Sequence, residues 1–158
     1  MERAPTYIEV GYSTAQEYWE EIVLASAARF RADPTRAHAM AVAIYVSHFL
    51  DWVFHDKHPR EDTQGNPLYV AFKQRHYRAC PELTWLVDLV DVAKRRGLGR
   101  PAALVKLKSS GGRRKRAPAE GPGAAAPAED ALLLEMNGAY HRFEEVMDRA
   151  VAYWRKNR

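Results

Sequence analysis

Hydrophobic residues in the N-terminal two thirds of the chain recur every three or four positions, a spacing that places them on one face of an α-helix. Ser13 followed by Gln16 matches a capping box, so the pattern predicts a first helix over residues 14–32. Asp33-Pro34 can end that helix and begin a second one, which we expect over residues 34–56. The short connection predicts an antiparallel pair of helices.

Two further helices are marked by a polar residue followed by proline. Asn66 and Pro67 provide a cap and a first helical position, which predicts a third helix through residue 79. The pair Cys80-Pro81 begins a fourth helix. We expect this helix to end near Arg96, because Gly97 suits the position that follows a helix C-terminus.

The pattern changes after Pro101. Residues 103–108 alternate as in a short strand, whereas residues 109–130 are rich in Gly, Ala and Pro without periodicity and predict a flexible insertion. The apolar run 131–136 precedes Asn137-Gly138, a pair that favours a tight hairpin turn, and the returning strand should end near residue 142. A final amphipathic helix follows, with an apolar face formed by Phe143, Val146, Met147, Ala150, Val151 and Trp154.

These elements predict an α+β fold that is mainly α: a four-helix N-terminal bundle, a small antiparallel sheet and a C-terminal helix packed on that sheet. The 158 residues are 47% hydrophobic and 28% charged, which is the balance of a folded globular protein. A chain of this length fits one core rather than two. We therefore expect a single domain over 1–158, with a flexible basic insertion loop at 109–130.

The positive charge of the chain is concentrated in that insertion. The formal net charge is +4, and the basic run consists of Arg113, Arg114, Lys115 and Arg116. Such a run could bind nucleic acid by neutralising phosphates. No aromatic residue interleaves it, so it offers no stacking platform for single-stranded bases. A flexible basic loop without a specific role is the alternative.

Cysteine content and apolar runs bear on the compartment. Cys80 is the only cysteine, so an intramolecular disulfide and a zinc site built on paired thiolates are both excluded. The first residues lack the basic and apolar segments of a signal peptide. The longest apolar stretch, 39–54, is interrupted by Ser47, His48 and Asp51. We expect a reducing, cytoplasmic location and no membrane insertion.

The most unusual chemistry lies in the second predicted helix. At about 100° per residue, His48, Asp51 and His55 fall on one face together with Tyr45 and Trp52. The opposite side is apolar and is formed by Val42, Val46, Phe49, Leu50 and Val53. We therefore expect this helix to be the central, most buried element, from which two imidazoles and a carboxylate project together.

Polar groups on a buried helix need partners, because each one left unpaired costs about 1–3 kcal/mol. The imidazoles of His48 and His55 could bind a divalent metal, with Asp88 or Asp91 of the fourth helix completing the ligand set. They could instead serve metal-free acid–base chemistry, or hold the helices in register through hydrogen bonds. Their spacing is not the one found on the zinc-binding helix of metalloproteases.

Two other clusters have simpler interpretations. Asp91 and Arg95 are spaced for an i, i+4 ion pair on a solvated helix face. Asp88 becomes a functional candidate if that face turns toward His48. In the third helix, His76 has basic neighbours and is expected on the surface.

Three segments resemble a set of small uncharacterised bacterial proteins that share an S-H-x-x-D-W-x-x-H helix. The segments are Ser47-His48-Phe49-Leu50-Asp51-Trp52-Val53-Phe54-His55, Cys80-Pro81-Glu82-Leu83 and the helix at 88–95. The resemblance implies a helical region, then a short sheet and a final helix that carries an aromatic–Trp pair like Tyr153-Trp154. Such proteins tend to have Asn and His where this sequence has Asp91 and Arg95.

A more distant similarity is to the HEPN helical bundles, many of which are ribonucleases. These use an Arg and a His that are separated by four to six intervening residues and lie at the interface of a helix pair. In this sequence Arg31 and His38 match that spacing, with Asp33-Pro34 between them. The similarity implies nuclease activity as an alternative function.

No catalytic constellation in the sequence is specific, since it contains no phosphate-binding glycine loop and no nucleophile elbow. The leading hypothesis is therefore a helical protein that acts by binding, as a homodimer or with a protein partner. One alternative is a metal-dependent or HEPN-like nuclease or hydrolase that uses His48, Asp51 and His55. The other is nucleic-acid binding through the basic loop.

Overall fold

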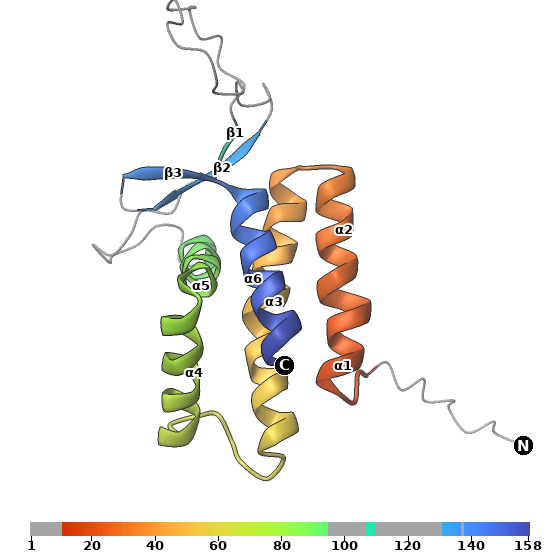
Figure 1. Cartoon of the computed structure of the whole chain (residues 1–158), viewed down its shortest axis with the longest axis vertical. Helices are drawn as coiled ribbons and strands as arrows, with labels where there is room; N and C mark the ends of the chain where they lie inside the picture. The colour runs from red at the N-terminus through yellow and green to blue at the C-terminus, as the bar shows by residue number, and fades with distance from the viewer. Residues whose placement is uncertain (1–10, 95–106, 110–130, 137) are drawn as a thin grey trace, which may run out of the picture.

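The computed structural model describes residues 11–94, 107–109, 131–136 and 138–158. In these ranges a helical bundle is followed by a three-stranded antiparallel sheet and a C-terminal helix (Figure 1). The predicted α+β, mainly α class is confirmed. The predicted insertion lies outside the described residues except for Ser109.

The bundle is built from helices whose spans agree with the periodicity of the sequence. A π-helical segment, η1, lies within the first predicted helix, where the sequence suggested an uninterrupted α-helix. The helical elements are α1 (Ala15–Tyr18), η1 (Trp19–Leu24), α2 (Ala25–Ala32), α3 (Arg36–Lys57), α4 (Pro67–Ala79) and α5 (Pro81–Lys94).

The start of α1 is a capping box that lies one residue later than predicted. Thr14 Oγ1 accepts the Glu17 amide at 3.1 Å. The Glu17 carboxylate reaches back and accepts both the amide and the hydroxyl of Ser13 at 2.8 Å. Because Glu17, rather than Gln16, faces the cap, Thr14 is the N-cap residue.

The start of α3 also differs from the prediction. Thr35 caps this helix, and its hydroxyl accepts the His38 amide at 3.2 Å. Asp33 has the extended backbone that a residue before proline favours, so Asp33-Pro34 lies in the connection rather than at the cap. Asn66 caps α4 as predicted, by accepting an amide of the first turn at 2.9 Å.

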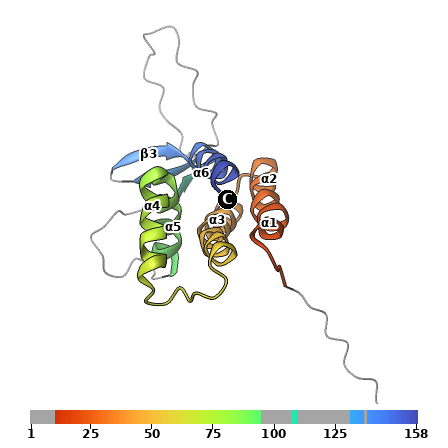
Figure 2. The same ribbon diagram turned by 60° about the horizontal axis from the view of Figure 1, so that its bottom comes forward.

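Helix α3 lies at the centre of the bundle. It packs against the helix formed by α1, η1 and α2 on one side, against α4 and α5 on another, and against α6 on a third. Figure 2 shows these neighbours around α3, with no described helix or strand on the side opposite α6. Aromatic rings pack against one another in the core. The ring centroid of Phe49 in α3 lies 5.1 Å from that of Trp19 and 5.3 Å from that of Trp154. The predicted central position of this helix is confirmed.

Of the helices in the described ranges, α3 is the one long and apolar enough to span a membrane by length and composition. A core helix of a soluble protein passes the same test. Its packing against helices on three sides is compatible with a soluble protein.

The C-terminal part is a small sheet with one helix beneath it. The predicted hairpin is confirmed, with Met136 paired to Ala139 across a turn in which Gly138 has φ of 80°. The predicted strand at 103–108 is described only from residue 107 onward, where it pairs with β2. Alternate residues of β2 are buried in the core against α6. The elements are β1 (Leu107–Ser109), β2 (Leu132–Met136), β3 (Ala139–Arg142) and α6 (Phe143–Asn157).

Candidate functional site

The residues with the most unusual pattern in the sequence do not converge on a metal site. His48 and His55 are exposed, and Asp51 is half-buried with its Oδ1 accepting a hydrogen bond from the Tyr69 hydroxyl of α4. Among the described residues, no group of three or more His, Cys, Asp or Glu side chains is placed to hold a metal ion. The expected shared ligand set is not found, because the common face of these residues turns to the uncovered side of α3 rather than into the bundle.

We name this face the α3 stripe. Its two aromatic residues are half-buried, and Trp52 stacks on Tyr18 of α1 with ring centroids 5.0 Å apart. Burial raises the pKa of Tyr18 to about 12, with Tyr45 and Asp51 near enough to add to the shift. The stripe is therefore an aromatic surface that carries imidazoles and one carboxylate. Its members are Tyr45, His48, Asp51, Trp52 and His55.

Three carboxylates lie near Tyr77 of α4. Burial raises the pKa of Tyr77 to about 12, and the negative charges of Asp51, Asp91 and Asp88 add to the effect. Burial also raises the pKa of Asp88, and the negative charge of Asp91 adds a smaller increase. Asp88 is thus half-buried near Tyr77, rather than on a fully solvated face as the simpler interpretation had it. The predicted ion pair of Asp91 involves Arg95, which lies outside the described residues.

The sequence missed a buried histidine. His76 is only 3% exposed, and its Nδ1 shares a hydrogen bond of 2.6 Å with the Tyr153 hydroxyl of α6. Burial lowers the pKa of His76 to about 4, and the charges of Arg75 and Lys57 add to this, so the imidazole stays neutral near pH 7. The expected surface position is wrong. His76 follows Phe72 by one helical turn and shares its buried face, a spacing that could have revealed it.

A second polar cluster joins the corner between α4 and α5 to α6. Glu82 Oε1 accepts from Arg149 at 3.0 Å, and Glu82 Oε2 accepts from the Cys80 thiol at 3.5 Å. Burial alone would raise the pKa of Glu82, but hydrogen bonds from its own backbone, Arg149 and Cys80 outweigh it and lower the pKa. Burial raises the pKa of Cys80 to about 11, so this cysteine is a thiol and not a nucleophile at neutral pH. These contacts link the start of α5 to α6.

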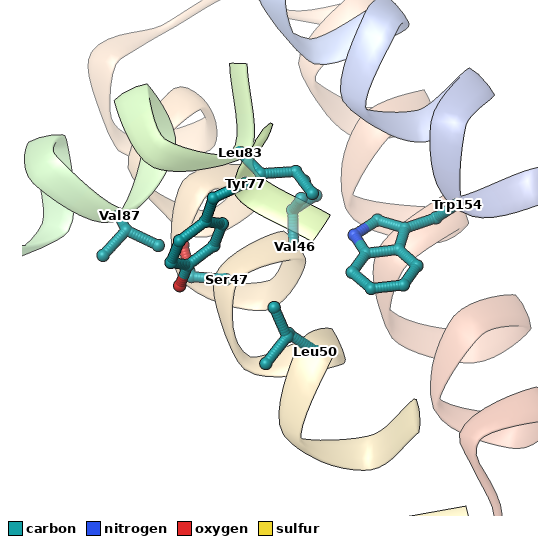
Figure 3. A pocket seen from close by; sticks show the side chains of 7 residues that line it. All are labelled: Val46, Ser47, Leu50, Tyr77, Leu83, Val87 and Trp154. Atoms are coloured by element: carbon teal, nitrogen blue, oxygen red, sulfur yellow. The ribbon is translucent and has the colours of Figure 1, made fainter. Parts of the chain in front are cut away.

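One buried donor has no partner. Trp154 is fully buried, and its Nε1 makes no hydrogen bond to any described residue. An unpaired buried N–H of this kind costs about 1–3 kcal/mol. Figure 3 shows the indole nitrogen directed toward Val46 and Leu83, into a seam between α3, the corner of α4 and α5, and α6. The seam is too narrow to admit a water molecule, and its lining residues are Val46, Ser47, Leu50, Tyr77, Leu83, Val87 and Trp154.

A wider hollow lies where α1, α3 and α6 meet, and its walls carry two guanidinium groups and one carboxylate. Its walls include Gln16, Asp56, Arg155 and Arg158. Asp56 accepts the backbone amide of Ala15 at 3.0 Å. Arg158 donates to the neutral side chain of Gln16, a bond that orients the guanidinium without neutralising its charge.

The remaining sequence candidates do not form a site in the described structure. The basic run Arg113–Arg116 lies outside the described residues. Arg31 and His38, the pair with HEPN-like spacing, have separate partners. Arg31 forms an ion pair of 2.6 Å with Asp148 of α6, whereas His38 bonds to the backbone oxygen of Asp33 at 2.7 Å.

No family model, curated protein or solved structure matches this chain.

Proposed function

We propose that this chain acts by binding, and that it associates with a second copy of itself through the α3 stripe. The observation that supports this is the incomplete burial of α3, in which His48 and His55 are exposed and Asp51 is only half-buried. A helix that is apolar around most of its circumference is normally covered on every side. The side of α3 opposite α6 carries these residues together with the half-buried rings of Tyr45 and Trp52, and tyrosine and tryptophan are enriched in protein interfaces.

The chemistry of the stripe suits a second copy. His48 and His55 lie about one helical turn on either side of Asp51. If two copies pair with their α3 helices antiparallel, an imidazole of each copy lies opposite the carboxylate of the other. The two-fold symmetry then makes the imidazole–carboxylate contact twice, with the same surface of each copy, as in an isologous interface.

The association is tested by sedimentation velocity over a series of protein concentrations. We expect a dimer whose dissociation constant rises at least tenfold in His48→Glu, because that change brings a like charge to Asp51 of the other copy. His48 is exposed, so the variant should fold. Gln74→Glu is the matched control, since it adds the same charge at an exposed position of α4 outside the stripe and should leave the dimer unchanged.

Two results would contradict self-association. One is a wild-type chain that stays monomeric up to about 100 μM, where a specific interface of ordinary size should be populated. The other is equal weakening by His48→Glu and Gln74→Glu, which would indicate a general effect of charge rather than a contact at the stripe.

We also propose a cytoplasmic location. Cys80 is a free, buried thiol, so the described fold does not depend on a disulfide and suits a reducing compartment. Fractionation of cells that produce the chain should recover it with the soluble cytoplasmic proteins. Recovery in washed membranes would contradict the proposal.

A further inference from the structure

The seam beside Trp154 is too narrow in this structure to admit a water molecule, and it is faced by a buried donor that has no partner among the described residues (Figure 3). We propose that it is a binding site for a small, neutral, largely apolar molecule that carries one hydrogen-bond acceptor, with Trp154 Nε1 as the donor. This inference does not depend on self-association, because the seam lies between helices of one chain, whereas the α3 stripe is on its surface.

The Trp154 ring cannot readily turn to another acceptor. Its centroid lies 5.3 Å from Phe49, 4.8 Å from His76 and 5.4 Å from Tyr153. Rotation of the indole would break these contacts, which come from α3, α4 and α6. The acceptor must therefore come to the nitrogen, through the seam that it faces.

The walls of the seam define the rest of the ligand. Val46, Leu50, Leu83 and Val87 make it mainly apolar, and no ionised side chain lines it, so an ion would lose its hydration without compensation. In the structure the seam is too narrow for a water molecule. A water would also need two to four polar partners, whereas a carbonyl on an apolar ring needs only the one donor and places its carbons against the apolar walls once the seam widens.

Entry is from the side where α3, α4 and α5 meet. Tyr77 and Val87 are half-buried at this end, where Ser47 also lines the seam. The Ser47 hydroxyl already donates to the Ala43 carbonyl at 2.6 Å. Because the seam is narrow, a ligand must move the Tyr77 side chain aside to reach Trp154, so binding and widening of the seam occur together.

The test uses nuclear magnetic resonance on the full chain with two probes of similar size, cyclohexanone and benzene. The chain has four tryptophans, so four indole N–H signals are expected, and Trp154→Phe identifies the one from residue 154. Cyclohexanone should shift that signal saturably and bind at least tenfold more tightly than benzene, which lacks a carbonyl. Ligand-observed spectra should show that this tenfold preference disappears in Trp154→Phe.

Two further variants separate the seam from general effects. Trp85→Phe alters a half-buried ring that packs on His141 at 4.7 Å outside the seam, and it should keep the tenfold preference. Val87→Phe fills the entry end and should weaken cyclohexanone binding at least tenfold while the sedimentation behaviour stays unchanged. The proposal is overturned if neither probe shifts the Trp154 signal saturably, or if the preference persists in Trp154→Phe. If Trp154→Phe does not fold, the Val87→Phe variant provides the test: binding of cyclohexanone as tight as to the wild type would overturn the proposal.

Discussion

Protonation of His76 is expected to make the free energy of unfolding depend on pH. The folded chain lowers the pKa of His76 from its ordinary 6.5 to about 4. Above pH 6.5 the imidazole is neutral in both states, and its contribution to stability is complete. Between pH 6.5 and 4 only the unfolded chain takes up the proton, so stability falls as the pH falls. The whole effect is about 3 kcal/mol, of which about 2 kcal/mol lies between pH 7 and pH 5.

The groups around His76 leave this assignment clear. Tyr153 of α6 shares its hydrogen bond, and Arg75 and Lys57 add positive charge that disfavours the imidazolium. The pKa of Tyr153 is raised, and that of the neighbouring Cys80 is raised to about 11, so neither group titrates between pH 5 and pH 7. The expected loss of stability in that range therefore belongs to the imidazole.

The assay is urea unfolding of the wild type and of His76→Gln at pH 7 and pH 5. The variant cannot titrate at this position, so the wild type should lose about 2 kcal/mol more than the variant between the two pH values. The other histidines affect both proteins alike and cancel in the comparison. Equal pH dependence of the two proteins would refute the reasoning. A second test needs no variant: a pKa near 6.5 for His76, measured by nuclear magnetic resonance titration of the folded wild type, would refute it as well.

Three further outcomes are expected. Arg149→Ala should lower the free energy of unfolding by about 1 kcal/mol in urea titrations, because Glu82 keeps its buried carboxylate but loses its cation, whereas Arg155→Ala should have little effect. Alkylation of Cys80 by iodoacetamide at pH 8 should be at least 100-fold slower in the folded chain than in urea, since burial raises the thiol pKa to about 11, and equal rates would contradict that burial. Gly138→Ala should cost about 1 kcal/mol in thermal or urea unfolding, because φ of 80° is unfavourable for a side chain, and an unchanged stability would contradict the turn geometry.

Local patterns in the sequence were sufficient to predict the helices and the hairpin. The 3.6-residue period, the Asn66 cap and the Asn137-Gly138 pair each depend on residues that are close in sequence. The caps at Thr14 and Thr35 were placed one or two residues early, because neighbouring residues of similar chemistry compete for the same position. The π-helical segment was not predicted, since the apolar spacing also fits an α-helix.

The candidate site was harder to predict because periodicity shows which residues share a face, but not what covers that face. His48, Asp51 and His55 do share a face, yet it is the one that α3 leaves uncovered. His76 has basic neighbours and was expected at the surface, yet α6 covers it. The exposure of Asp88 is intermediate between that of His48 and that of His76, since Asp88 is half-buried near Tyr77.

The helix that decides these outcomes is α6, the last element of the chain. Its residues Arg149, Tyr153 and Trp154 reach Glu82, His76 and Phe49, which are 67 to 105 positions away in the sequence. Contacts of such separation leave no periodic signature. Helix α6 occupies one side of α3 and covers His76, whereas no described helix or strand covers the opposite side, on which the α3 stripe lies. The buried polar groups therefore depend on where α6 docks, and the proposed binding surface is on the side of α3 that α6 does not reach.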